Sequence, residues 1–433
     1  MSIFKEMNSF LLDGKHNNWS IIKLKHLLRK RNEKDKPELE LLSVYRDYGV
    51  IPKSSRDDNH NRESLDLSNY RVVYKNDLVM NKMKGWQGSL AISRFNGIVS
   101  PAYIVCDVDE SKVIPQYLHH ILRSRKYIDV YKALSYGIRT DQWELHFEDF
   151  QELEVALPPR ELQIKIARFI DEKVSRIHSL SDELRKKVEI LKQYRSAIIT
   201  TAVTKGHDPN VSMKDSKIEW LGTVPENWEV SQLGYFAEVK ARIGWKGLKA
   251  DEYVEDGYIF LATPNIKNRE IDYVNVNFIT KERYLESPEI MLNEGDVLLA
   301  KDGSTLGTVN IIRKLPKEGT VNSSIAIVRP HKEIHSLFLR YYFESNYMKH
   351  LIQAFKDGMG VPHLFQKDIK KFKIVLPPIN EQIEISNFID DKIEKIDTAM
   401  SLINQQIQKL DEYRSSLITE AVTGQIDVLK MSI

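Results

Sequence analysis

Two segments of the chain concentrate basic, amide and aromatic side chains of the kinds that bind nucleic acids. The first segment carries Lys82, Lys84, Trp86, Gln87 and Arg94. The second carries Lys240, Arg242, Trp245, Lys246 and Lys249, with Arg269 and Lys301 further along. Lys and Arg bind phosphates, and Arg and Gln also hydrogen-bond to base edges. The alternative is two ordinary solvated loops, in which each Trp anchors its loop to the core. Taken together, the clusters predict contact with DNA.

Sequence motifs of the common enzyme classes are missing. There is no GxxxxGK[ST] or GxGxxG phosphate loop, no HExxH zinc motif and no GxSxG nucleophile motif. The Asn-Pro-Pro-aromatic tetrapeptide of amino-methyltransferases is absent as well. Residues 301–307 are interpreted as a hairpin turn, and the ExK fragment at 238–240 lacks a paired acidic residue. We therefore expect a binding protein with no catalytic residue, no metal site and no cofactor of its own.

Length and composition set the broad class of the protein. The 433 residues suffice for two to four domains at roughly 100–200 residues each. The formal net charge is only +2, so a uniformly basic protein is excluded and any DNA contact must come from local patches. The single cysteine, Cys106, excludes a disulfide framework and a cysteine-built zinc site. No apolar run is long enough for a membrane helix or a secretory leader, so we expect a cytoplasmic protein.

An internal repeat organises the sequence. Residues 157–204 align without a gap on residues 376–423, and 20 of the 48 aligned pairs are identical. Chance would give about three, so this is a duplication. The regions between the repeats align more loosely, with shifting offsets that indicate insertions and deletions in loops. The order along the chain is therefore variable, conserved, variable, conserved.

Each conserved copy predicts a long amphipathic helix after a rigid Leu-Pro-Pro junction. Between residues 171 and 204 apolar side chains recur in a 3,4 heptad pattern, and the second copy keeps the register. The seam comprises Val174, Ile177, Leu184, Val188, Leu191 and Ile198, then Ile393, Ile396, Met400, Ile403, Ile407, Leu410 and Leu417. Each helix should span about 30 residues, or roughly 45 Å. We expect the two to pair as an antiparallel coiled coil. The alternative is that each packs only on its own domain.

The variable regions read as mixed α and β structure. Strands are expected at 72–74, 104–105, 258–261, 296–300 and 325–328, with helical stretches at 116–125 and 336–355, and residues 205–228 are interpreted as a linker. The expected fold class is α/β (mixed α+β), with two globular domains separated by two long antiparallel coiled-coil helices in a pseudo-twofold duplication. The expected boundaries are 1–156, 157–214, 215–375 and 376–433.

Four sequence features together resemble the specificity subunit of type I restriction-modification systems (the HsdS family). They are the starts LPPRELQ and LPPINEQ, the FID helices ending in YRSxxITxAVT, the linker GHDPNVSMKDSKIEWLGTVPENWEV and the two variable halves. The resemblance covers nearly the whole chain. The sequence departs from the family pattern at residues 160–163, where RELQ replaces the usual xxEQ form, and it lacks a DSKIEWLG-type segment before Trp19.

The resemblance implies two target-recognition domains (1–156 and 215–375), each reading one half of a split double-stranded DNA target. The helices (157–214 with the linker, and 376–433) would set the gap between the halves. Two modification subunits would supply S-adenosylmethionine and the methyl transfer, and restriction subunits would supply ATP- and Mg-dependent cleavage in host defence, so this chain would be inert alone. Tyr194, Arg195, Tyr413 and Arg414 are candidates for docking these partners. Alternatively, the two arginines set the helix register. Other readings are a protein-only coiled-coil scaffold and a stand-alone DNA methyltransferase or nuclease.

Overall fold

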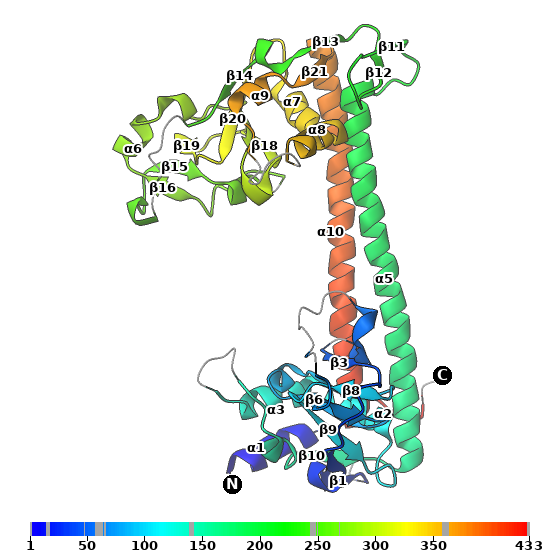
Figure 1. Cartoon of the computed structure of the whole chain (residues 1–433). Coiled ribbons are helices and arrows are strands. Elements are labelled where there is room, and N and C mark those ends of the chain that lie inside the picture. Colours follow the sequence, from blue (N-terminus) through cyan, green and yellow to red (C-terminus); the bar gives the residue numbers. More distant parts are fainter. Residues whose placement is uncertain are drawn as a thin grey trace. The chain divides into compact units, whose positions relative to one another are not determined.

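The protein divides into two compact units. The computed structural model describes residues 2–13, 18–46, 48–56, 64, 66–137, 143–242, 248, 250–267, 269–356 and 363–430. Unit 1 comprises Met1–Arg185 and Gln405–Ile433, and unit 2 comprises Lys186–Asn404. Each unit holds a mixed α+β domain and part of both long helices (Figure 1). The predicted fold class, two mixed domains joined by long helices, is confirmed.

Unit 1 is built from short antiparallel strands covered by helices. Its four-stranded sheet has the order β2-β9-β6-β7, and separate pairs join β1 to β10, β3 to β4 and β5 to β8. The strands are β1 (Ser20–Lys23), β2 (Leu28–Arg31), β3 (Leu42–Tyr45), β4 (Gly49–Pro52), β5 (Arg71–Val73), β6 (Leu78–Asn81), β7 (Leu90–Ile92), β8 (Gly97–Val99), β9 (Tyr103–Val108) and β10 (Glu154–Leu157). The helices are α1 (Ser2–Leu12), α2 (Pro115–Leu122), α3 (Arg125–Leu134) and α4 (Phe147–Phe150).

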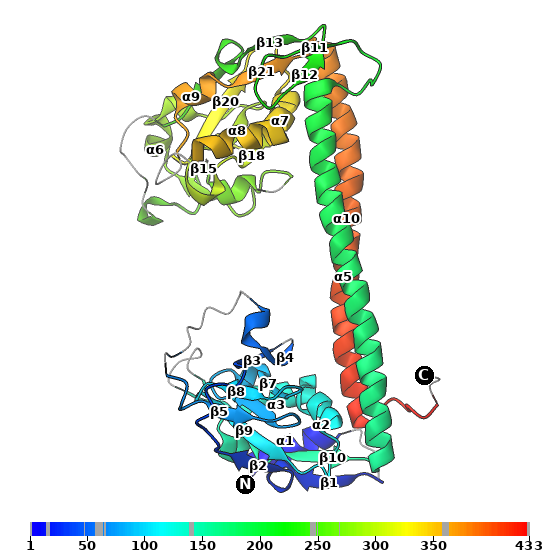
Figure 2. The ribbon, with the colours of Figure 1, turned by 45° about the vertical axis from the view of Figure 1, so that its right-hand side comes forward.

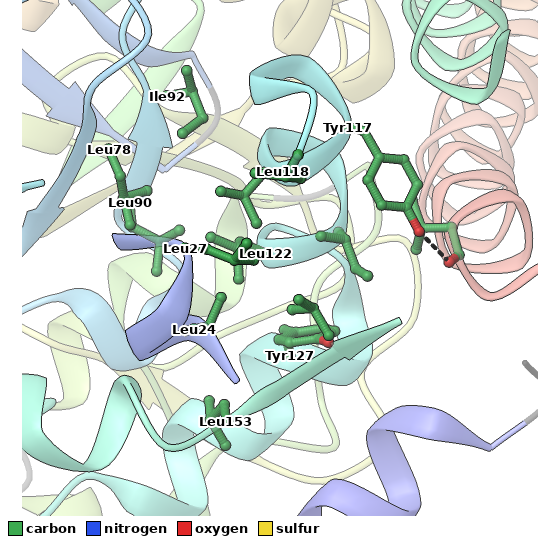
Figure 3. Close-up of a cluster of buried hydrophobic side chains, with 14 of the residues drawn as sticks. Leu24, Leu27, Leu78, Leu90, Ile92, Tyr117, Leu118, Leu122, Tyr127 and Leu153 are labelled. Atoms are coloured by element: carbon green, nitrogen blue, oxygen red, sulfur yellow. Dashed lines mark hydrogen bonds between the residues drawn. The ribbon is translucent and has the colours of Figure 1, made fainter. Parts of the chain in front are cut away.

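The core of unit 1 lies between the sheet and α2. Leu78 and Leu90 of the sheet face Leu118 and Leu122 of α2, as Figure 3 shows, and all four are buried. Tyr117 is fully buried beside them, and its hydroxyl lies 2.9 Å from the carbonyl oxygen of Ala156 and 3.2 Å from that of Val422. The tyrosine therefore joins α2 both to β10 and to the end of the second long helix.

Unit 2 repeats this plan. Its four-stranded sheet has the order β14-β20-β17-β18, beside a sheet of order β16-β15-β19 and the pairs β13 with β21 and β11 with β12. The strands are β11 (Met213–Asp215), β12 (Thr223–Pro225), β13 (Glu229–Gln232), β14 (Ala237–Lys240), β15 (Tyr258–Leu261), β16 (Asn277–Ile279), β17 (Val297–Ala300), β18 (Val309–Ile311), β19 (Gly319–Val321), β20 (Ile325–Pro330) and β21 (Lys373–Leu376). The helices are α6 (Lys281–Leu285), α7 (Ser336–Glu344), α8 (Asn346–Lys356) and α9 (Gln366–Lys370). The duplication seen in the conserved segments thus extends through both domains.

Two local predictions need correction. The helical stretches 116–125 and 336–355 are each interrupted, because Ser124 (ψ 154°) and Ser345 (ψ 154°) are extended and separate α2 from α3 and α7 from α8. The segment 205–228 is also more than a linker. It forms the β11–β12 hairpin, and Trp228 is fully buried in the core of unit 2, with its indole N–H 3.0 Å from the Glu381 carboxylate.

The long helices exceed the predicted length. α5 runs over Arg160–Lys205 (46 residues) and α10 over Ile379–Thr423 (45 residues), which is about 70 Å each rather than 45 Å. The extra turns come directly after the Leu-Pro-Pro junctions. There Ile166, Phe169 and Ile170 of α5 are buried in the core of unit 1, and Ile385 and Ile389 of α10 in that of unit 2. Because these turns pack on their own domain, their apolar residues do not continue the heptad pattern.

Within each unit the two helices lie side by side (Figures 1 and 2). In unit 1 the early part of α5 packs with the late part of α10, with Ile177 and Leu417 in one core. In unit 2 Arg195, late in α5, bonds to Asp397, early in α10. The helices are therefore antiparallel in both units. None of the thirteen predicted seam side chains is exposed.

A buried glutamine attaches the start of each long helix to its domain. Gln163 donates to the carbonyl of Pro158 (2.9 Å) and accepts from the backbone N–H of Ile114 (2.8 Å). Gln382, its counterpart in the repeat, donates to the Pro377 carbonyl (2.9 Å) and accepts from the N–H of His335 (2.8 Å). In each copy the buried side-chain amide both donates and accepts a hydrogen bond. The Gln that ends each LPPxxxQ motif is therefore explained by its structural role.

The aspartate of each FID motif attaches the long helix to its domain at a second point. Asp171 lies 3.0 Å from Nε2 of His120 on α2. Asp390 accepts from the Tyr341 hydroxyl on α7 and from Arg313, at 3.0 Å. Burial acts to raise the pKa of Asp390, but the hydrogen bond from Tyr341 and the charge of Arg313 outweigh it, so the pKa is lowered. The carboxylate is therefore kept ionised at the point where helix and domain meet.

We predict that Asp390→Asn destabilises unit 2 by about 1–3 kcal/mol at pH 7, because the partners of a charged hydrogen bond are left without it. A lowered folded-state pKa gives stability that is present above the unfolded value of about 3.9 and is lost as pH falls through the folded value. The difference from wild type in thermal unfolding should therefore shrink on acidification. Asp391→Asn is the matched control, since that exposed residue pairs with Lys395 of its own helix. An equal loss in both variants would contradict the attachment.

We also predict that Tyr117→Phe lowers the free energy of unfolding by about 1–3 kcal/mol, because the one buried O–H group that lies between two carbonyls is lost. Urea unfolding followed by fluorescence measures the change. Tyr235→Phe serves as the control, since Tyr235 is 72% exposed. Wild-type stability of the Tyr117 variant would show that the hydroxyl does not join α2 to α10.

Candidate nucleic-acid interface

Four residues of the first predicted cluster lie in the loop between β6 and β7. The loop contains the short helix η3 (Gly85–Gln87) and starts with a turn in which the Asn81 side chain accepts from the N–H groups of Met83 and Lys84. Lys84 is exposed, and Lys82, Trp86 and Gln87 are half-buried. The loop thus presents two cations and an amide at the end of the central sheet of unit 1.

Trp86 has a structural role in this loop. Its indole N–H donates to the Met83 carbonyl at 3.1 Å, and its ring meets Trp143 edge to face at 5.7 Å. The first contact lies within the loop, and the second joins the loop to another part of unit 1. The arrangement fits the alternative in which the tryptophan anchors the loop, while the neighbouring lysine side chains remain available for a ligand.

A cavity of about 370 Å³ next to this loop brings in residues that the sequence analysis missed. Its lining combines Lys82 with Lys30 and Arg71, and it also holds Asn32, His146 and the carboxylates Glu144 and Glu148. Lys30 donates to Glu148 at 3.1 Å, and Arg71 donates to the Asn32 side chain at 3.2 Å. The Nε of Arg71 is buried and has no hydrogen-bond partner among the described residues. The basic run at residues 29–31 was the sequence signal for this site.

The described cations of the second predicted cluster have carboxylate partners. Lys240 lies 2.6 Å from Glu238, and Lys301, which is nearly buried, lies 2.8 Å from Asp302. Arg242 is also largely buried, with Glu286 at 3.9 Å. Trp245, Lys246 and Lys249 lie outside the described residues. Exposed pairs such as Lys240 with Glu238 contribute little to stability, so such a lysine can exchange its carboxylate for a phosphate.

Two residues of the predicted DNA-binding clusters form ion pairs with the long helices. Arg94 lies 3.6 Å from Asp171 on α5, and Arg269 lies 3.6 Å from Asp390 and 3.8 Å from Glu394 on α10. Arg94 is at the same place in the repeat as Arg313, which also binds Asp390. The structure therefore places these arginines at the attachment of domain to helix, away from the loop of Lys82 and Lys84.

The four candidate docking residues differ in their surroundings. Tyr194 and Tyr413 occupy equivalent positions and are 55% and 56% exposed. Arg195 is mostly buried and binds Glu344 at 2.5 Å and Asp397 at 3.2 Å. Arg414 lies 3.2 Å from His178 and 3.5 Å from Asp411. The tyrosines are thus open to a partner, whereas Arg195 bonds to carboxylates of its own unit.

Among the described residues, no group of three or more His, Cys, Asp or Glu side chains is placed so that it could hold a metal ion. No helix in this part of the chain is long and apolar enough to span a membrane.

Comparison with known proteins links this architecture to a family. The chain is 22% identical over 368 residues to the "Type I restriction enzyme MjaVIII specificity subunit" of Methanocaldococcus jannaschii, covering 83% of this chain and 81% of the relative. It is also 22% identical over 362 residues to the "Type I restriction enzyme EcoBI specificity subunit" of Escherichia coli, covering 82% of this chain and 74% of the relative.

Solved structures share the fold. A chain described under "Structural basis underlying complex assembly and conformational transition of the type I R-M system" matches with a TM-score of 0.72 and 15% identity, covering 95% of this chain and 99% of that one. The HsdS subunit from Thermoanaerobacter tengcongensis matches with a TM-score of 0.53 and 14% identity, covering 95% and 98%. The family model "Type I restriction modification DNA specificity domain" matches residues 16–190 and 225–410. Because it covers both halves of the duplicated fold, the chain belongs to the family of type I restriction modification DNA specificity domains.

Proposed function

We propose that this chain is the DNA-specificity subunit of a type I restriction-modification complex. Each mixed domain reads one half of a bipartite duplex target, and the helices α5 and α10 set the gap between the halves. The observation that carries the proposal is that a DNA specificity domain occurs twice, each copy attached to the same pair of long helices. Both attachments use the same Gln and Asp of the repeat, so the chain carries two domains held in equivalent ways.

The catalytic steps then belong to partners. We infer that the chain has no catalytic centre and binds no cofactor, and that two modification subunits bring S-adenosylmethionine and flip and methylate the target base. Restriction subunits would add ATP- and Mg-dependent translocation and cleavage. A duplicated chain offers two like docking surfaces, as a pseudo-twofold requires. The exposed Tyr194 and Tyr413 are the residues we place on these surfaces. Such a DNA-reading complex acts in the cytoplasm.

The loop of Lys82 and Lys84 and the cavity beside it are the proposed DNA contacts of unit 1. Lysines bind phosphates without regard to sequence, whereas a guanidinium can donate two bonds to guanine. Arg71 is the candidate for the second role, because it is the arginine that lines the cavity among the described residues. In unit 2, the half-buried Lys240 of β14 is the proposed phosphate contact.

The first test of the proposed function lengthens both helices. One heptad inserted at matching places in α5 and α10 keeps the seam register and adds about 10 Å, or roughly three base pairs. We expect a methylated motif with both half-sites kept and a gap longer by about that amount, measured by sequencing DNA methylated by the complex. The matched control exchanges residues 1–156 for another recognition domain, which should change one half-site and leave the gap. Altered bases after the helix insertion would argue against separate reading and spacing.

A second prediction separates the two kinds of DNA contact. Lys84→Gln should weaken binding to all duplexes alike and reduce the salt dependence by about one released counterion. Arg71→Gln should cost roughly 1–3 kcal/mol on the cognate site and relax one base position. Fluorescence anisotropy over a salt series, on cognate and scrambled duplexes, measures both effects. Lys165→Gln, an exposed lysine of α5, is the control. If neither variant differs from this control, the cavity is not the DNA-contacting surface.

A further inference from the structure

A second cavity of unit 1, of about 330 Å³, lies where α2 and α3 meet the two long helices. Four arginines and three histidines line it, and no acidic residue does. The arginines come from separate parts of the chain, namely Arg46, Arg123, Arg125 and Arg414. This cavity is distinct from the one beside Lys82, with which it shares no lining residue. A cavity whose lining holds four arginines and no carboxylate, among the described residues, favours an anionic occupant.

The N-terminus of α3 adds uncharged donors to this cavity. Ser124, which lines the cavity, is the N-cap residue of this ten-residue helix, but its side chain makes no capping bond. The serine is 2% exposed, and its hydroxyl has no hydrogen-bond partner among the described residues. The first turn of α3 contains no acidic residue, so neither a side chain nor a capping carboxylate meets its positive end. Such an end binds phosphate and similar oxyanions readily.

Two of the four arginines have a carboxylate partner that lies outside the lining. Asp411 lies 3.5 Å from Arg414, and Asp129 lies 4.0 Å from Arg125, both on the same helix as their partner. Neither carboxylate lines the cavity. Asp171 is bound to His120, which does line it, and also to Arg94. Arg414 also meets the ring of His178, 3.2 Å away.

The equivalent junction of unit 2 contains two carboxylates that the junction of unit 1 lacks. Glu344 precedes the serine before α8, just as Arg123 precedes the serine before α3. Asp397 aligns with His178 in the repeat. There Arg195, the counterpart of Arg414, binds both Glu344 and Asp397. The backbone N–H of Asn346 at the start of α8 donates to the Thr200 hydroxyl at 2.9 Å. In unit 2, carboxylates and a hydroxyl of the chain itself thus bind the groups at this junction. In unit 1, Arg123 and His178 occupy the positions of the two carboxylates.

We propose that the cavity between α2, α3 and the long helices of unit 1 binds a phosphate group, with Arg414, Arg125 and the N-terminus of α3 as donors. The phosphate replaces the two carboxylates that unit 2 supplies from its own chain. This site is separate from the proposed DNA contacts at Lys82 and Lys84, and its existence does not depend on them. Either a free phosphoanion or a backbone phosphate of DNA can provide the group.

The test titrates the full-length chain with inorganic phosphate and with chloride at matched ionic strength, and follows thermal unfolding. We expect the unfolding midpoint to rise with the logarithm of the phosphate concentration above Kd, by roughly 3–6 °C at ten times Kd, and not to rise with chloride. Arg414→Gln should abolish the rise, and Ser124→Ala should reduce it. Arg195→Gln is the matched control in unit 2 and should keep it. Absence of this rise in wild type, or a rise that Arg414→Gln leaves intact, would overturn the proposal.

A second arm identifies the source of the phosphate group. Duplex DNA is titrated onto wild type and Arg414→Gln at fixed salt, with and without saturating inorganic phosphate. Weaker DNA binding in the variant, together with competition by phosphate in wild type, would identify a backbone phosphate. Unchanged DNA affinity beside lost phosphate binding would identify a free phosphoanion. Arg125→Gln, which removes a proposed donor whose side chain is exposed, should weaken the phosphate response in either case and keeps the test decisive if Arg414→Gln folds poorly.

Discussion

A helix of 46 residues with one apolar face cannot remain stable in water unless that face is covered along its length. Each fully buried Leu or Ile contributes about 1.5–3 kcal/mol, so the seam of α5 needs a continuous partner. The partner is α10, which runs antiparallel to it in both units. α10 is the copy of α5 in the repeat, so one duplicated segment supplies both partners of the helix pair. Each helix begins directly after the strand pair that closes its own domain.

The sequence allowed the repeated elements to be predicted because their signals are local. The heptad spacing, the Leu-Pro-Pro junctions and the strand runs at 258–261 and 325–328 all appear in the structure. The helix starts were missed, because Ile166, Phe169 and Ile170 face a domain and leave the heptad register. The interruptions at Ser124 and Ser345 were missed for a related reason. Serine is compatible with a helix, and only the tertiary packing of α2 and α3 makes it a break.

The candidate site was predicted less completely, because charge alone does not show what a side chain faces. Arg94 and Arg269 look like DNA-binding residues in the sequence, but their partners are aspartates on helices about 80 to 120 positions away. Arg71 and Lys30 lie far apart in the sequence and meet in one cavity only through the fold. The sequence was enough to identify the basic loop of Lys82 and Lys84, whereas contacts between residues far apart in the chain could be found only in the structure.

The two halves share one topology and differ in the charges placed on it. The Gln and Asp that attach each domain are the same in both copies, so the framework is preserved. The loops and the junctions of helix and domain vary, as Glu344 and Asp397 against Arg123 and His178 show. A preserved framework with variable surfaces is what independent reading of two half-sites needs, because one surface can change without moving the other.

The most direct test of this account is to express the chain with its modification subunit and map every methylated position in the host genome by single-molecule sequencing. The account predicts a split motif, with two defined half-sites separated by a gap of fixed length and unspecified sequence. A single continuous motif, or methylation without any motif, would contradict the claim that two domains on a common helix pair each read one half of the target.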